Sequence, residues 1–187
     1  MYSIEEVNRF DADRFIEVFG NIVEFCQLCS AAIYSYRPFR NVDHIHQLVC
    51  AFIDELPLSG KEGVLRLHPD LAGKVAQSGL LSSESTDEQN AAGLHSLTEQ
   101  ERHILINHNG SYREKFGFPF VICAKQNKKN AILSGIEARV KNDKITEILT
   151  GIEEVKKICE IRLKNIIFES SASEPLSTIR SEREAKL

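Results

Sequence analysis

The chain has 187 residues, of which 42% are hydrophobic and 27% charged, as in ordinary globular domains, so neither a disordered polymer nor a fibrous repeat is expected. Lys and Arg number 23 against 27 Asp and Glu, which gives a formal net charge of -4 at pH 7. This charge provides no long-range positive field, so nucleic acid is not an expected partner. The apolar stretches are shorter than the roughly 20 residues that cross a bilayer, and we expect no membrane insertion.

The five cysteines favour a reducing compartment, because their number is odd, their surroundings are largely apolar and no secretory leader follows Met1. Cys26 and Cys29 have the C-x-x-C spacing, but no second pair completes a zinc site. The histidine pairs also lack the spacing of a metal cage, and no P-loop, G-x-G-x-x-G or nucleophile elbow occurs. We therefore expect no metal and no cofactor.

Hydrophobic residues recur at intervals of three and four along most of the chain, which is the period of an amphipathic helix. The clearest case is residues 43–56, where Asp43 is the expected cap and Pro57 the expected stop. Capping-box patterns predict three more helix starts: Ser3 with Glu6, Ser85 with Glu88, and Thr98 with Glu101. A last helix is expected from Asp143 or Thr146 to Phe168.

Only residues 121–124 read locally as a strand, and one strand alone cannot satisfy its own backbone groups. The fold class is therefore predicted to be all-α, with a single-domain helical bundle over residues 1–169. Residues 170–187 lose the apolar period and gain serine and charge, which predicts a flexible polar tail.

The tail ends in Ala185-Lys186-Leu187, which resembles the small-basic-Leu address that a peroxisomal import receptor reads. The alternative is a frayed terminus without a signal. We expect a peroxisomal location, with the cytoplasm as the alternative.

Three side chains are candidates for chemistry on physical grounds. His68 precedes Pro69, which predicts a helix break and an imidazole beside a cleft, although a bond to a backbone carbonyl is equally ordinary. Glu88 either closes a capping box or, with Gln89, orients a histidine and binds an amide-like group. Arg162 interrupts an apolar helical stripe, so its guanidinium either reaches the core edge or faces an anionic ligand.

Several strings occur in the chain in a distinctive order and spacing: His68-Pro69-Asp70-Leu71-Ala72-Gly73, Ser85 with Glu88-Gln89, Ala92-Gly93-Leu94, Asn107, Tyr112, the string KFGFPFVIC at 115–123, Arg139, Asn142 and Ile161-Arg162-Leu163. Together they resemble the 2-oxo-4-hydroxy-4-carboxy-5-ureidoimidazoline (OHCU) decarboxylase family over roughly residues 5–168. The long KFGFPFVIC string is the most specific of them.

The resemblance implies an all-helical, cofactor-independent carboxy-lyase that converts OHCU to S-allantoin and carbon dioxide in urate breakdown, and that forms a homodimer. It also implies that His68 is catalytic and that Glu88 is its partnering carboxylate. Substrate binding is implied for Pro69, Ser85, Gln89, Arg162 and the segment Phe120, Val121 and Ile122. The alternative function is a non-catalytic helical module that binds a purine catabolite or a protein partner.

Overall fold

The computed structural model describes residues 1–73, 76 and 78–168, and every regular element in this part of the chain is helical. The α-helices are α1 (Ile4–Arg9), α2 (Ala12–Phe19), α3 (Gln27–Tyr34), α4 (Val42–Glu55), α5 (Leu58–Arg66), α7 (Ser83–Ala91), α8 (Glu99–Phe116), α9 (Lys129–Arg139) and α10 (Lys144–Ile166), with short 3-10 turns η1 (Leu94–Ser96) and η2 (Ala124–Gln126). The predicted all-α class is confirmed. The predicted tail at 170–187, with Ala185, Lys186 and Leu187, lies outside the described residues.

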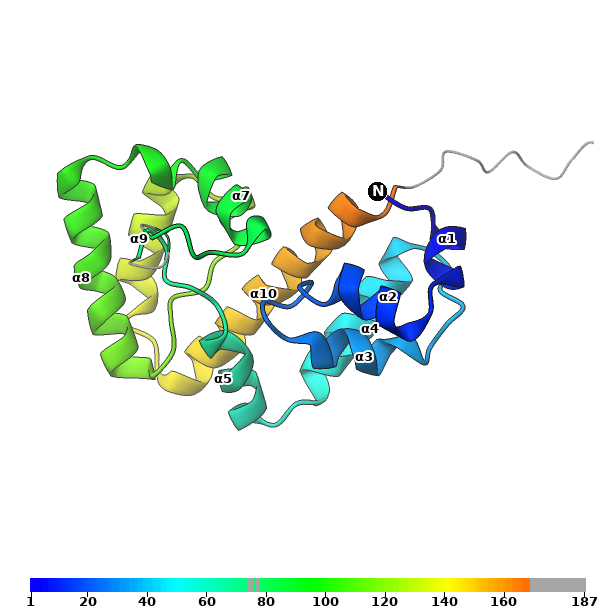
Figure 1. Ribbon diagram of the computed structural model, residues 1–187. Coiled ribbons are helices and arrows are strands. Elements are labelled where there is room, and N and C mark those ends of the chain that lie inside the picture. The colour runs from blue at the N-terminus through cyan, green and yellow to red at the C-terminus, as the bar shows by residue number, and fades with distance from the viewer. Residues whose placement is uncertain (74–75, 77, 169–187) are drawn as a thin grey trace, which may run out of the picture.

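Helix α10 is the axis of the molecule. Figure 1 shows it running between the helices α1 to α4 on one side and α7, α8 and α9 on the other. It packs against α4 and α5, while α3 packs between α2 and α4. The two ends of the described chain also meet, because Tyr2 and Ile167 form an isolated β-bridge. This arrangement places the face of α10 that looks toward α7 at the junction of the two groups of helices.

Two of the predicted capping boxes are confirmed. Ser3 with Glu6 opens α1, and Thr98 with Glu101 opens α8. The predicted last helix does begin after Asp143, whose carboxylate accepts hydrogen bonds from the backbone of the first turn.

Two predicted helix starts are wrong by a few residues. Asn41, and not Asp43, caps α4, because its Oδ1 accepts from the backbone N–H of His44 at 2.9 Å. Helix α7 begins three residues before the predicted box, since Ser82 Oγ accepts from the backbone N–H of Ser85 at 3.1 Å. This shift places Ser85 in the first turn and leaves Glu88 without a capping role, so both side chains can form hydrogen bonds with buried groups of other helices.

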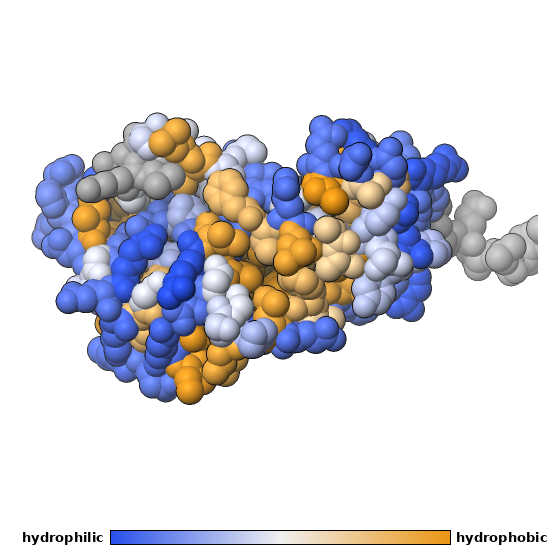
Figure 2. Space-filling view, turned by 60° about the horizontal axis from the view of Figure 1, so that its bottom comes forward, coloured by the Kyte–Doolittle hydropathy of each residue, from blue (hydrophilic) through white to orange (hydrophobic). Residues whose placement is uncertain are grey.

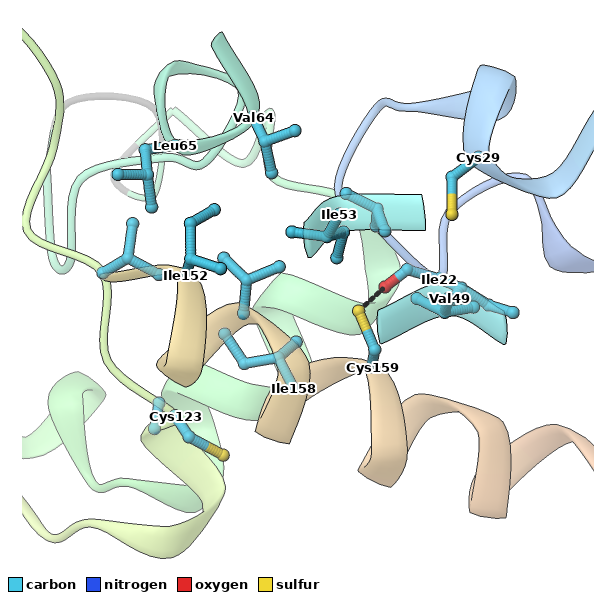
Figure 3. Close-up of a cluster of buried hydrophobic side chains, with 14 of the residues drawn as sticks. Ile22, Cys29, Val49, Ile53, Val64, Leu65, Cys123, Ile152, Ile158 and Cys159 are labelled. Carbon is cyan, nitrogen blue, oxygen red and sulfur yellow. Dashed lines mark hydrogen bonds between the residues drawn. The ribbon is translucent and has the colours of Figure 1, made fainter. Parts of the chain in front are cut away.

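The core is built around α10 and α5. Figure 3 shows Val64 and Leu65 of α5 facing Ile152 of α10, with Ile53 of α4 beside them. A Cβ atom on Gly151 would lie 2.8 Å from Leu65 Cδ2, so a larger residue at this position would force the buried Leu65 side chain to move.

Four of the five cysteines, Cys26, Cys29, Cys123 and Cys159, lie in the core or pack against it. All five are free thiols, and burial raises the pKa of Cys29 to about 12. Cys159 donates to the backbone carbonyl of Ile22 at 3.3 Å (Figure 3). Over residues 1–73, 76 and 78–168, no group of three or more His, Cys, Asp or Glu side chains could hold a metal ion. Cys29 belongs to the buried core and Cys26 packs against it.

The surface is divided between apolar and polar regions. Figure 2 shows apolar side chains gathered across the middle of one face, with polar side chains toward both ends. Within the described ranges, no helix combines the length and the apolar composition that crossing a bilayer requires.

The segment 121–124, which reads locally as a strand, forms no strand. Val121 to Cys123 are irregular, and Ala124 begins η2. The chain leaves α8 at Gly117, and this segment bonds to α10 through Cys123 and Glu154 while η2 contacts α7, so its backbone groups are not committed to a sheet.

Candidate active site

The structure brings the predicted site residues together at one pocket, with the exception of Arg162. The pocket holds about 340 Å³ of space, its open mouth included. Its lining consists of His68, Pro69, Leu71, Ser85, Glu88, Gln89, Phe120, Val121, Ile122, Ala124 and Ile158. The walls therefore come from the turn after α5, from α7, from the irregular segment 120–122 and from α10.

His68 lies in the turn that follows α5, where its backbone N–H still bonds to Leu65 at 3.2 Å. Its Nδ1 is 3.0 Å from the carbonyl oxygen of Val64. Because a carbonyl oxygen can only accept, Nδ1 carries the ring proton and Nε2 carries the lone pair. Nε2 is buried and has no hydrogen-bond partner among the described residues.

The environment keeps the His68 ring neutral. Burial, and after it the positive charge of Arg162, lowers the pKa of His68 from 6.5 to about 4. At neutral pH the imidazole therefore offers an unprotonated Nε2 at the pocket wall, which is the form that a general base requires.

Glu88 does not orient His68 in this structure, in contrast to the expectation from the sequence. Its carboxylate accepts from Arg162 instead, with Nε to Oε1 at 2.7 Å and Nη2 to Oε2 at 2.9 Å. The backbone carbonyl of Val64 fixes the His68 ring. Arg162 therefore neither reaches the edge of the core nor faces the pocket as a ligand-binding cation. It forms a buried ion pair beside the pocket.

The Arg162 guanidinium is fully engaged with protein groups. Besides Glu88, it contacts Glu24 Oε2 at 2.7 Å, Ser85 Oγ at 3.3 Å and the carbonyl of Asn21 at 2.8 Å. Burial alone would lower the pKa of Arg162, but the two carboxylates raise it above its usual range. The side chain is 2% exposed and stays charged.

Glu24 belongs to the same cluster, and sequence reasoning missed it. Its side chain is fully buried, and it accepts from Ser82 Oγ at 2.8 Å and from Ser85 Oγ at 3.0 Å. The available signal was an acidic residue inside the apolar run Ile22-Val23-Glu24-Phe25. A carboxylate in such a run needs a buried cation, and Arg162 is that cation.

Free hydrogen-bonding groups remain at the pocket for a ligand. Gln89 uses Oε1 to accept from the backbone N–H of Ala72 at 2.9 Å, and its amide nitrogen makes no bond with the described part of the chain. The backbone amides of Phe120, Val121 and Ile122 also donate to no described residue. Amide donors on one wall and the Glu88 carboxylate on another suit a planar ligand that carries both carbonyl and N–H groups.

A family model and the curated relatives indicate the same family. The OHCU decarboxylase family model matches residues 8–164. The 2-oxo-4-hydroxy-4-carboxy-5-ureidoimidazoline decarboxylase of Xenopus laevis is 46% identical over 160 residues, which is 86% of this chain and 91% of that protein.

Two solved structures share the fold. The crystal structure of (S)-allantoin synthase has a TM-score of 0.74 at 21% identity and covers 92% of this chain, which spans 56% of that longer one. The crystal structure of OHCU decarboxylase in the presence of (S)-allantoin has a TM-score of 0.63 at 19% identity and covers 82% of this chain and 96% of that one.

Proposed function

The chain belongs to the OHCU decarboxylase family, and from this premise we propose that it removes carbon dioxide from OHCU to yield S-allantoin in urate breakdown. The observation that carries the proposal is the pocket itself. It combines the unprotonated Nε2 of a buried neutral histidine with a carboxylate, an amide side chain and free backbone amides. The alternative of a non-catalytic binding module gives no reason for an unpartnered imidazole nitrogen at the pocket wall.

The reaction supplies its own electron sink. The ring carbon that loses carboxylate adjoins a C=N bond, so the pair from the breaking C–C bond forms a new C=C bond while the C=N pair moves to nitrogen, which takes a proton. The hydroxyl on the first carbon then loses its proton and becomes a carbonyl, and the neighbouring carbon takes up a proton. The net change is uptake of one proton and release of carbon dioxide. Many decarboxylases need a cofactor as the sink, and this substrate does not.

His68 is assigned the proton transfers. Its Nε2 accepts the hydroxyl proton, while the bond from Nδ1 to Val64 holds the ring in the tautomer that leaves Nε2 free. Ser85, Gln89 and the amides of the 120–122 segment hold the ring and the ureido arm, and Pro69 shapes the wall beside the imidazole. A substrate held in one orientation receives the returning proton on one face, which yields a single enantiomer.

Arg162 is assigned to positioning. A direct contact between its guanidinium and a substrate carboxylate would require Glu24 or Glu88 to leave its present ion pair. We therefore assign Arg162 to hold Glu88 at the pocket wall, where the carboxylate accepts hydrogen bonds from the substrate.

Decay of freshly generated OHCU, followed by circular dichroism with and without the protein, tests the function. The wild type is expected to accelerate the decay and to give one enantiomer of allantoin. His68→Asn should stay folded and lose about 10² to 10⁴ in rate. His103→Asn changes an exposed histidine on α8 and is the matched control. Unchanged decay with the wild type would favour the binding module instead.

We also propose that Ala185-Lys186-Leu187 is read by the peroxisomal import receptor. Its support is the tripeptide pattern, together with a polar stretch of sequence before it. A fluorescent protein that carries residues 170–187 at its carboxyl end should become punctate with a peroxisomal marker, and the same fusion with Leu187→Glu should stay diffuse. A diffuse signal from both fusions would favour the cytoplasm.

A homodimer is the proposed assembly, on the strength of the resemblance to the family. Light scattering coupled to gel filtration should give twice the mass of one chain, and a mass of one chain would reject it.

A further inference from the structure

One face of α10 contacts the site along most of its length. Glu147, Glu154, Ile158 and Arg162 are separated by seven, four and four residues, so they share a face of the helix. Arg162 holds Glu88 on one wall of the pocket, and Ile158 lines the pocket. The two glutamates lie nearer the amino end of the helix, where Glu154 bonds to the backbone of Cys123 and Glu147 reaches Val121 through Arg139.

Glu147 holds that wall through Arg139. The carboxylate of Glu147 is fully buried and accepts from Arg139 Nε at 2.9 Å, from Asn142 Nδ2 at 2.8 Å and from the hydroxyl of Tyr112. Arg139 Nη1 in turn donates to the carbonyl oxygen of Val121 at 2.8 Å. A backbone carbonyl of the pocket wall is thus fixed by a buried ion pair.

Glu154 holds the same wall at its other end. Its Oε2 accepts from the backbone N–H of Cys123 at 2.8 Å, and its Oε1 pairs with Lys157 at 2.6 Å. The carboxylate is 13% exposed, so its bonds are only partly screened by water. Between the two fixed points, the amides of Val121 and Ile122 donate to no described residue.

We propose that Glu154 is a positioning residue that aims these free amides at the ureido arm of the substrate. The inference rests on the proposed function, and it identifies the part of the site that recognises the urea-like group of the substrate. A urea oxygen accepts two N–H bonds at once, and two backbone amides can supply them only if the segment is held in one conformation. Glu154 contributes this order from outside the pocket, since the pocket lining does not include it.

Loss of this bond should affect binding more than chemistry. His68 lies on a different wall and is held by Val64, while Glu88 is held by Arg162. Both arrangements stay intact when Cys123 loses its partner. Part of the binding free energy of the ureido arm is then used to order the segment each time the substrate binds. This weakens binding, so KM rises while kcat stays nearly unchanged.

The experiment compares Glu154→Ala, Glu154→Gln and Glu153→Ala in the OHCU assay. Glu154→Ala should raise KM about 10-fold, with kcat within about 3-fold of the wild type, which is the cost of one charge-assisted hydrogen bond. Glu154→Gln keeps an acceptor oxygen and should restore most of the KM. Glu153 is exposed on the next position of the same helix and pairs with Lys156, so Glu153→Ala is the matched control for helix and charge.

Calorimetric titration with (S)-allantoin runs in parallel and should show the same order of affinities. Equal KM and equal allantoin affinity in Glu154→Ala and Glu153→Ala would overturn the inference, as would a fall in kcat at constant KM. An inactive wild type would instead count against the proposed function, and the titration would still decide the role of Glu154. If Glu154→Ala does not fold, Glu154→Asp, which shortens the side chain by one methylene, takes its place under the same KM criterion.

Discussion

Arg162 binds Glu88 through two parallel hydrogen bonds, although the two residues are 74 positions apart in the chain. One end of the pair comes from α10 and the other from α7, which lie in different parts of the fold. The pair is bidentate and buried, so it fixes the direction of the carboxylate as well as its charge. The position of α7 at the pocket therefore depends on the guanidinium of α10.

Replacing Arg162 with lysine should lower kcat/KM by about 10-fold or more, because one ammonium cannot reproduce a planar fork. Arg162→Met should lower the free energy of unfolding by about 3 to 5 kcal/mol, because it leaves Glu24 and Glu88 buried without a cation. Urea unfolding and the OHCU assay measure the two effects. Arg14→Lys alters a pair with Glu17 in which both side chains are exposed, and should change stability by less than about 1 kcal/mol. Wild-type kinetics in Arg162→Lys would remove the residue from the site.

Glu24 should be essential to the stability of the cluster. Glu24→Ala removes the acceptor of Ser82 and Ser85 and one of the two anions on Arg162, so unfolding should become easier by about 2 to 4 kcal/mol. Glu24→Gln keeps an acceptor and should cost less. Glu17→Gln changes a carboxylate that is 69% exposed, and should leave the unfolding curve in place. Equal curves for the Glu24 and Glu17 variants would contradict the role assigned to Glu24.

The helices were predictable where one periodic face and a local cap agree. The capping boxes at Ser3 and Thr98 are formed by residues three apart, so the sequence contains the whole interaction. Ser85 and Glu88 have the sequence pattern of a capping box but do not form one, because the hydroxyl of Ser82, one turn earlier, caps the helix instead. The local pattern alone cannot tell which of the two serines caps the helix. The tertiary bonds that Ser85 and Glu88 make decide it, because they occupy both side chains elsewhere.

The sequence predicted which residues line the site better than it predicted the hydrogen bonds between them. The family resemblance pointed to His68, Ser85, Glu88 and Gln89, which do line one pocket. The partner of each side chain depends on how helices distant in sequence meet, and no spacing along the chain encodes that. Glu24 and Glu154 were missed for this reason, since each acts across more than thirty residues of sequence on a group of another element.

The depressed pKa of His68 predicts an unusual pH dependence of activity. The neutral ring is the active form, so kcat/KM should fall only as the pH approaches about 4, the value to which burial and Arg162 lower the pKa. An imidazole with an unperturbed pKa would begin to lose activity near pH 6.5. Rate measurements from about pH 4.5 to 8 distinguish the two cases. An acid limb centred near pH 6.5 would show that His68 is not held neutral by its surroundings.

The same pKa predicts how stability depends on pH. Below the ordinary value of 6.5 the unfolded chain binds a proton at His68, while the folded protein binds it only near pH 4. The unfolded state therefore binds more protons in this window, and the contribution of His68 makes stability fall as the pH drops from 6.5 to 4. His68→Asn removes this contribution, so the variant should lose less stability over the window than the wild type. Urea midpoints at the two ends of the window give the difference, and parallel losses would contradict it.

Two glycines, Gly110 inside α8 and Gly117 directly after it, should change stability in opposite directions when each is replaced by alanine. Gly110 lies in the interior of the helix, and an added Cβ would meet nothing within 4 Å. Gly110→Ala should raise the free energy of unfolding by about 0.5 to 1 kcal/mol, because alanine loses less backbone entropy on folding.

Gly117 ends the same helix at a φ of +81°, where its N–H bonds to the carbonyl of Arg113 at 2.8 Å. A Cβ there would lie at ordinary contact distance, 3.6 Å, from Arg66 and Glu62, so the penalty comes from the backbone alone. Gly117→Ala should lower stability by about 1 to 2 kcal/mol. Because both variants make the same chemical change, glycine to alanine, at the same helix, the difference between them reflects the backbone conformation at each position. Thermal midpoints that move in the same direction would show that the left-handed turn after α8 is not required at this position.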